Sequence, residues 1–592
     1  MYKITGRVAD ILQEKIYAAE IVVEEGIIRS ITRIPEEQVT DGAGYILPGF
    51  IDAHVHIESS LLIPSEFARL AVVHGTIATV SDPHEIANVC GLPGVEFMIN
   101  DGKKVPFYFN FGAPSCVPAT AWETAGAVLD ASKVGELLRS DAIKYLSEMM
   151  NFPGVLNKDP EVMEKIATAH RLGKPVDGHA PGLRGEAARQ YIAAGISTDH
   201  ECFTAEEALD KLQYGMKILI REGSAARNFD ALIGLLNDYP DQMMLCSDDK
   251  HPDSLVAGHI DRLCARAIAR GIDVFKVLKA ACINPVLHYR LDSGLLRPGD
   301  PADLIIVEDL EQFRVMRTYI KGQLVAENGI SLIGQPALVK ARQTGDVGSG
   351  DVPVRGVSLD PVYINQFNCQ LRQPADFAYL LDKWGEQENV EQVYVIEALD
   401  GQLITEKRIA PVKDVGPVDG YLQSNPGKDI LKIVVVNRYQ AAPVAKSFIR
   451  NFGLKRGALA SSVAHDSHNI VAVGVDDESI CRAVNLVIEQ KGGLSCVDLE
   501  GPAATDADAD PEKSGGISAE ELVLPLPVAG LMSPVDGYRV ADAYTTLDAM
   551  AKGLGCTLSA PYMTLSFMAL LVIPHLKLSD LGLFDGDKFA LV

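Results

Sequence analysis

The chain has 592 residues and a mass of 63.8 kDa, which is more than one compact domain usually holds, so we expect two or three domains. Its hydrophobic fraction of 47% and charged fraction of 22% are typical of a globular protein and exclude a disordered or fibrous chain. The formal net charge of −25 excludes the overall basic character of a nucleic-acid-binding protein, so we expect no nucleic-acid partner.

Several features predict a cytoplasmic location. The ten cysteines form no CxxC pair and no regular spacing, which is typical of reduced thiols in a long chain. Charged residues interrupt the apolar residues of positions 1–22, where a signal peptide would have an apolar core. The most apolar stretch, residues 562–573, is well short of the roughly 20 residues that a membrane-spanning helix needs, so we expect no membrane association.

Two strand-rich segments flank a longer region of different character. Residues 1–47 contain short apolar runs with a turn at Glu25–Gly26, and residues 301–340 show the same pattern with a turn at Lys321–Gly322. We expect these two segments to form one small β-sandwich domain.

Residues 48–300 alternate between short apolar runs and stretches with helical periodicity, such as 161–172 and 255–269. Eight runs can be counted, and eight βα units in about 245 residues match the size of a (β/α)8 TIM barrel. A doubly wound sheet would give a similar local pattern, but the count favours the barrel. The runs begin near residues 46, 76, 105, 143, 175, 196, 217 and 242.

A glycine-rich polar stretch at residues 341–356 is typical of a linker. Residues 357–592 then predict a C-terminal α+β domain. Residues 433–436 and 470–473 are strand-like, and residues 483–490 are helical.

A pair of histidines ends the first run of the predicted barrel. His54 and His56 are two apart, so on a strand both side chains point to the same face and could close on one metal ion. An HxH pair alone is a weak signal, since two such histidines can simply face solvent. The carboxyl end of a barrel strand, however, is where catalytic groups lie.

Four later runs also end in side chains that can ligate metals. A single histidine of this kind is more often a hydrogen-bonded core residue, and a carboxylate among apolar residues is costly to bury unless it is paired or ligates a metal. Six such groups at strand ends are hard to explain in that way. Strands four, five, six and eight supply Glu148, His179, His200 and Asp248, respectively.

This arrangement over residues 48–248 resembles the amidohydrolase superfamily of metal-dependent hydrolases, which carry a split β-sandwich beside a (β/α)8 barrel. The resemblance implies one or two divalent ions. His54, His56 and Asp248 would hold one ion and His179 and His200 the other. Most binuclear relatives use a carbamylated lysine as the bridging ligand, whereas this sequence offers Glu148.

Longer motifs resemble the bacterial adenine deaminases within that superfamily, nearly from end to end. This resemblance implies hydrolysis of adenine to hypoxanthine and ammonia, with Mn²⁺ or Fe²⁺ as the metal. Asp248 would transfer the proton of the attacking water, and His84 and Glu85 would handle protons on the ring nitrogens. The motifs are Pro48–Ser60, Ser81–Val89, Glu148–Val155, Asp177–Gly182 and Ser247–Pro252, with Ser461–Asn469 in the C-terminal domain.

Other interpretations share parts of this pattern. Another amidohydrolase that cleaves a cyclic amide or an N-acyl group would use the same ligands, and a barrel that has lost catalysis could serve as a scaffold. Residues His465–His468 could form a second metal site, but a surface or lid loop is favoured because no further ligand lies nearby in the sequence. We expect a homo-oligomer.

Overall fold

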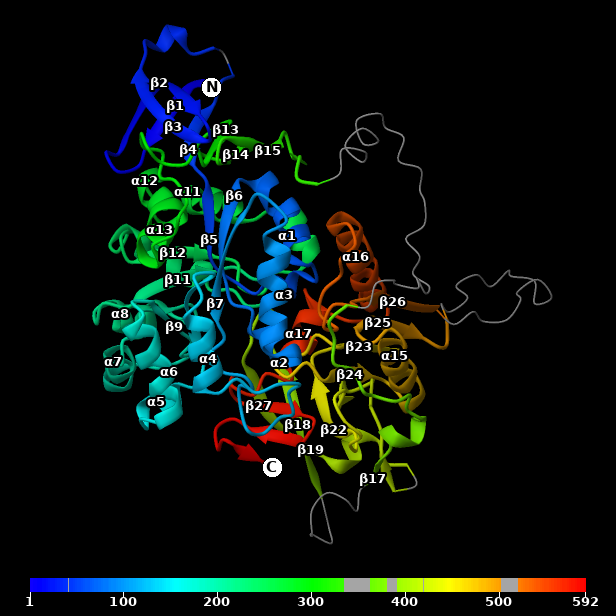
Figure 1. Cartoon of the computed structure of the whole chain (residues 1–592). Coiled ribbons are helices and arrows are strands. Elements are labelled where there is room, and N and C mark those ends of the chain that lie inside the picture. Colours follow the sequence, from blue (N-terminus) through cyan, green and yellow to red (C-terminus); the bar gives the residue numbers. More distant parts are fainter. Residues whose placement is uncertain (41, 335–362, 381–390, 419, 502–519) are drawn as a thin grey trace, which may run out of the picture.

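The computed structural model describes residues 1–592 except 41, 335–362, 381–390, 419 and 502–519. Figure 1 shows an amino-terminal sheet, a barrel beside it and a C-terminal domain that packs against the other end of the barrel. This architecture confirms the predicted fold class. The predicted linker at 341–356 lies outside the described residues.

Eight parallel strands form the barrel. Hydrogen bonds connect its two groups of strands, from Ser197 N to Val176 O (2.9 Å) on one side and from Asp248 N to His54 O (2.9 Å) on the other. The ring is therefore closed. The strands are β5 (Phe50–Val55), β6 (Thr76–Ser81), β7 (Tyr108–Ala113), β8 (Ile143–Met149), β9 (Val176–Gly178), β10 (Thr198–Asp199), β11 (Lys217–Arg221) and β12 (Met243–Cys246).

Helices that follow these strands in the chain cover the outside of the barrel (Figure 1). They are α1 (Pro64–Ala71), α2 (His84–Cys90), α3 (Leu92–Gly102), α4 (Ala131–Leu138), α5 (Phe152–Leu156), α6 (Pro160–Arg171), α7 (Gly185–Ala193), α8 (Ala205–Leu212), α9 (Phe229–Leu232), α10 (Pro252–Ala257), α11 (Ile260–Ala269), α12 (Val274–Leu278) and α13 (Asn284–Tyr289).

Glycines divide two segments that the sequence pattern treats as continuous. The run from residue 46 is split at Gly49, where a Cβ atom would lie 2.5 Å from Ile77 Cγ1, so the close approach requires glycine. The helical stretch 255–269 is two helices, α10 and α11, because Gly258 between them adopts a φ of 159°.

The segments on either side of the barrel share one eight-stranded sheet. Strand β4 pairs in parallel with β1 and antiparallel with β13, so residues from before and after the barrel lie side by side. The strands, in spatial order, are β16 (Ile330–Ser331), β15 (Gln323–Glu327), β14 (Val315–Ile320), β13 (Leu304–Val307), β4 (Tyr45–Pro48), β1 (Tyr2–Asp10), β2 (Lys15–Glu24) and β3 (Ile27–Arg33).

The C-terminal domain is built on a second eight-stranded sheet. Its strands, in spatial order, are β19 (Thr405–Pro411), β18 (Gln392–Ala398), β22 (Ala445–Arg450), β21 (Leu431–Val436), β24 (Ile470–Gly474), β23 (Ala458–Ser461), β25 (Gly493–Asp498) and β26 (Glu520–Pro525). Further elements are β17 (Tyr379–Leu380), β20 (Tyr421–Leu422), β27 (Leu576–Ser579), β28 (Gly582–Asp585) and β29 (Ala590–Leu591), with helices α15 (Asp477–Glu489), α16 (Gly537–Gly553) and α17 (Pro561–Phe567).

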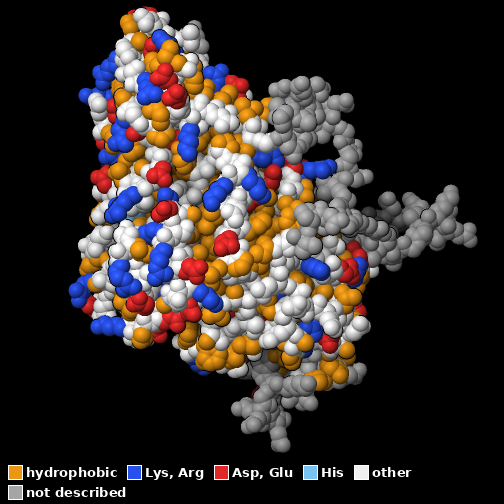
Figure 2. Space-filling view, viewed as in Figure 1, with side chains coloured by type: hydrophobic (Ala, Val, Ile, Leu, Met, Phe, Trp, Pro, Cys, Tyr) orange, Lys and Arg blue, Asp and Glu red, His pale blue; other side chains and the backbone are white. Residues whose placement is uncertain are grey.

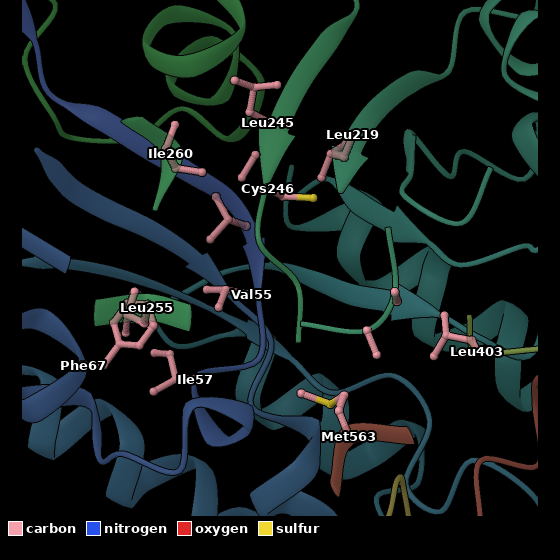
Figure 3. Close-up of a cluster of buried hydrophobic side chains, with 14 of the residues drawn as sticks. Val55, Ile57, Phe67, Leu219, Leu245, Cys246, Leu255, Ile260, Leu403 and Met563 are labelled. Atoms are coloured by element: carbon pink, nitrogen blue, oxygen red, sulfur yellow. The ribbon is translucent and has the colours of Figure 1, made fainter. Parts of the chain in front are cut away.

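The barrel and the C-terminal domain share a hydrophobic core. Figure 3 draws Leu403 and Met563 of the C-terminal domain together with barrel side chains such as Val55 and Leu219, and all four belong to one buried cluster. A backbone hydrogen bond also connects the two parts, because Ser533 N donates to Leu61 O (2.8 Å).

The outer surface shown in Figure 2 carries acidic and basic side chains interspersed with apolar ones. Within the described residues, the helices are all too short or too polar to cross a membrane.

Candidate active site

The six predicted ligand residues all lie at the carboxyl ends of barrel strands. Each is at most 5% exposed, and each strand aims its last side chains toward the same end of the barrel. His54 is the last but one residue of β5 and His56 directly follows that strand, Glu148 lies in β8, and the others follow β9, β10 and β12 within two residues. These last three are His179, His200 and Asp248.

His54, His56 and Asp248 form one group. The Nε2 atoms of the two histidines are 3.2 Å apart. Asp248 Oδ1 lies 3.5 Å from His54 Nε2 and 3.2 Å from His56 Nε2. The two histidines thus lie on the same side, as their spacing predicts, and Asp248 lies beside them, as the family resemblance implies.

Glu148 lies between this group and the other two histidines. Its Oε2 is 2.9 Å from His179 Nδ1 and 3.0 Å from His200 Nε2, and its Oε1 is 3.5 Å from His56 Nε2. One carboxylate therefore faces ligand candidates from three other strands, which is the position that a bridging ligand requires.

The donor set fits a divalent metal. Imidazole nitrogens and carboxylate oxygens suit Mn, Fe or Zn. Buried groups of such atoms, within 4.8 Å of one another in each group, share members and so form one continuous cluster. These groups include His54, His56 and Asp248; His54, Glu148 and His200; His179, His200 and Glu201; and His56, Asp82, His84 and Glu148.

Arg221, at the end of β11, neutralises part of the negative charge of the site. Its Nη1 donates to Asp248 Oδ2 (2.8 Å), and its Nη2 donates to Glu201 Oε2 (3.1 Å). Although burial opposes ionisation, this guanidinium holds the pKa of Asp248 well below its usual value. Asp248 is therefore charged and its Oδ1 faces the histidines.

The same effect acts on Glu148 and its neighbours. Burial disfavours its charge, but His179 and His200 hold the pKa of the Glu148 carboxyl well below its usual value. In turn, the carboxylates of Glu201 and Glu148 overcome the desolvation of His179 and raise its pKa to about 9.

The predicted residues His84 and Glu85 begin helix α2, beside the ligand cluster. His84 Nδ1 lies 3.0 Å from Asp82 Oδ2 and 3.5 Å from Glu148 Oε1. Its Nε2 lies 3.2 Å from Glu85 Oε1. Burial lowers the pKa of His84, but the carboxylates of Glu85 and Asp82 hold it well above its usual value. The structure thus brings both residues to the site.

Residues His465–His468 reach this site from the C-terminal domain. Of the favoured interpretation, a surface or lid loop, the surface location is wrong, because all four residues are at most 3% exposed. Asp466 Oδ1 lies 3.5 Å from His84 Nε2, while its Oδ2 finds no hydrogen-bond partner among the described residues. The barrel residues that contact His465–His468, such as His84 and Glu85, lie nearly 400 residues away along the chain, so the nearby sequence does not reveal them.

Sequence reasoning missed three other members of the site. Asp82 lies inside the motif Ser81–Val89, Glu201 directly follows His200, and Arg221 ends the seventh apolar run with a cation that is only 2% exposed. A charged residue at the end of an apolar run is the signal that could have identified Arg221, as it did Glu148.

Comparisons with known proteins show which families this chain is similar to. A model of the amidohydrolase family matches residues 45–325, and a model of the adenine deaminase C-terminal domain matches residues 402–505 and 512–590. A solved adenosine deaminase from Xanthomonas campestris with bound zinc is 15% identical, with a TM-score of 0.42, over 58% of this chain and 97% of that chain.

Two curated relatives extend over nearly the whole chain. An adenine deaminase of Sulfurovum sp. (strain NBC37-1) is 51% identical over 98% of this chain and 97% of its own length. An adenine deaminase of Salinibacter ruber is 50% identical over 100% of this chain and 98% of its own length. The chain therefore belongs to the adenine deaminase family of the amidohydrolases.

Proposed function

We propose that this enzyme hydrolyses adenine to hypoxanthine and ammonia. The observation that carries the proposal is the convergence of six buried ligand-type side chains on the strand ends around Glu148, in a chain of this family. Hydrolysis of an amidine carbon needs a strong nucleophile at neutral pH and groups that exchange protons with the ring and the leaving amine.

Two divalent metal ions fit the donor set. His54, His56 and Asp248 would hold one ion, His179 and His200 the other, and Glu148 would bridge them. When bound, such ions lower the pKa of a water molecule from about 15.7 toward about 7, so that it can attack at neutral pH. We propose Mn²⁺, with Fe²⁺ as the alternative, because oxygen and imidazole ligands suit both.

Asp248 is the proposed proton acceptor. Arg221 engages its Oδ2, which leaves Oδ1 facing the cluster. As the C6–O bond forms, Oδ1 takes the proton of the attacking water. It then delivers this proton to the exocyclic nitrogen as the C6–N bond breaks and ammonia leaves.

His84 and Glu85 are proposed to exchange protons with the ring nitrogens of the purine. Hypoxanthine carries a hydrogen on N1 that adenine lacks, so a second proton must reach the ring during the reaction. The two residues are adjacent and buried, and His84 Nε2, 3.2 Å from Glu85 Oε1, makes no hydrogen bond among the described residues, so it can exchange a proton with a substrate.

We also propose that the enzyme works in the cytoplasm as a homo-oligomer. Ten cysteines without a disulfide suit a reducing compartment. Leu12 and Leu287 are 53% and 63% exposed and line one surface hollow beside the barrel, where an apolar contact between subunits would cover them. Light scattering of the purified protein measures the assembly.

One assay tests the proposed reaction. Protein reconstituted with Mn²⁺ should release ammonia from adenine, and adenosine and dihydropyrimidines serve as control substrates. Ammonia release from adenine but not from the control substrates supports the proposal. Cleavage of a cyclic amide or an N-acyl compound instead would favour another amidohydrolase activity, and no turnover of any substrate would favour a scaffold.

A further inference from the structure

The Glu85 carboxylate is held by two histidines of the C-terminal domain. His468 Nε2 contacts Glu85 Oε2, and His465 Nε2 lies 3.2 Å from Glu85 Oε1. His465 Nε2 also lies 3.4 Å from Asp249 Oδ1. Each of these four residues is at most 6% exposed, so the contacts are shielded from water.

The hydrogen bonds of His468 fix its tautomer. The backbone N–H of Ala464 donates to His468 Nδ1 (3.2 Å), so this nitrogen is an acceptor. The ring hydrogen is therefore on Nε2, which donates it to Glu85 Oε2. His468 is a neutral donor that orients one oxygen of the carboxylate.

His465 lies between two acidic side chains. Its Nε2 faces the carboxylates of Glu85 and Asp249, and its Nδ1 lies 2.9 Å from Ser566 Oγ. Although burial opposes its charge, these two carboxylates raise the pKa of His465 to about 9. A cation of the C-terminal domain is therefore placed between two acidic side chains of the barrel.

Stability alone does not account for these contacts. Buried ion pairs contribute little to stability compared with apolar packing, because both partners lose their hydration. The same interface already contains apolar contacts, such as those of Met563. Charged contacts between His465 and the carboxylates of Glu85 and Asp249 are instead suited to fixing the orientation of the Glu85 side chain.

We propose that the C-terminal domain completes the active site, with His468 and His465 as positioning residues that hold Glu85 in the orientation from which it exchanges a proton with the purine ring. This inference rests on the proposed deamination of adenine. It gives the C-terminal domain a role in catalysis that the barrel alone cannot supply.

The test compares full-length variants loaded with Mn²⁺. His468→Ala should lower kcat for adenine by about 10²-fold, the effect of a displaced reacting group, with KM and metal content little changed. His468→Gln should regain most of this loss, because its amide N–H can donate to Glu85. His575→Ala is the control, since His575 is an exposed histidine of the same domain, paired with Asp587.

A double-mutant cycle with Glu85→Gln separates positioning from a general structural effect. In the Glu85→Gln background, His468→Ala should cost little more, because the carboxylate that it orients is already gone. Three results would each overturn the inference. The losses of kcat in the two single variants could add up in the double variant, His468→Ala could turn over adenine at the wild-type rate, or His468→Gln could be as slow as His468→Ala.

A second variant and a wild-type measurement complete the experiment. If His468→Ala does not fold, the same cycle with His465→Gln carries the test, since His465 contacts the same carboxylate. The wild-type protein tests the reaction itself, because a wild type that releases no ammonia from adenine contradicts the proposed function. If the wild type is active, the results for the variants decide the inference separately.

Discussion

Asp248 and Asp249 are neighbours with different partners. Asp248 Oδ1 faces His54 and His56, whereas Asp249 Oδ1 accepts a hydrogen bond from Ser59 Oγ (2.5 Å). Asp248→Asn should lower kcat by about 10²–10⁴-fold, because asparagine can offer an oxygen to a metal but cannot accept a proton at neutral pH. Asp249→Asn should cost less. Steady-state rates and metal content of both variants check this, and a dead Asp249→Asn beside an active Asp248→Asn would reverse the assignment.

Glu148 is the residue on which the binuclear proposal depends. Glu148→Gln keeps the shape of the side chain but removes the charge that faces His179 and His200. Metal analysis should show a loss of one or both equivalents, because a neutral amide is a poorer bridging ligand. Retention of two equivalents with unchanged turnover would make Glu148 a structural acid only.

The strand ends are the elements that carry the site, and β5 is the most direct test. His54→Ala or His56→Ala should lose metal and activity while the circular dichroism spectrum stays close to that of the wild type. The reason is that both side chains line the mouth of the barrel and do not fill its core. Full metal content in both variants would contradict their assignment as ligands.

Strand β27 carries a buried lysine away from the site, and it predicts a pH dependence of stability. Desolvation lowers the pKa of Lys577 to about 7, and its Nζ donates to Leu403 O (2.6 Å) and Phe567 O (2.9 Å). Between pH 7 and about 10.4 the unfolded chain binds a proton that the folded chain does not, so the contribution of Lys577 to stability rises with pH there.

Lys577→Met should therefore flatten the pH dependence of stability between pH 7 and 10. The thermal midpoints of both proteins at several pH values measure this difference. An equal slope in the wild type and the variant would show that Lys577 stays protonated in the folded state.

Local periodicity predicted most elements because it records which face of each strand or helix is buried. The eight runs became β5 to β12, and the strand-like residues 433–436 and 470–473 lie in β21 and β24. Close backbone approach is not visible in periodicity, so the breaks at Gly49 and Gly258 were missed. The contact between Glu85 and His468 was missed for a related reason, since it depends on how two domains pack.

At the scale of the whole molecule, the site joins parts that are distant in the sequence. Its groups come from seven barrel strands and the C-terminal domain, so ligation by metal should stabilise the folded chain and not the unfolded one. A ligand that binds only the folded state adds about 2.7 kcal/mol at a free concentration of 100 Kd. Removal of metal with a chelator should therefore lower the thermal midpoint, and Mn²⁺ should restore it. In the His54→Ala variant, Mn²⁺ should have a much smaller effect on the midpoint. An equal rise in the wild type and this variant would place the stabilising ion at another site.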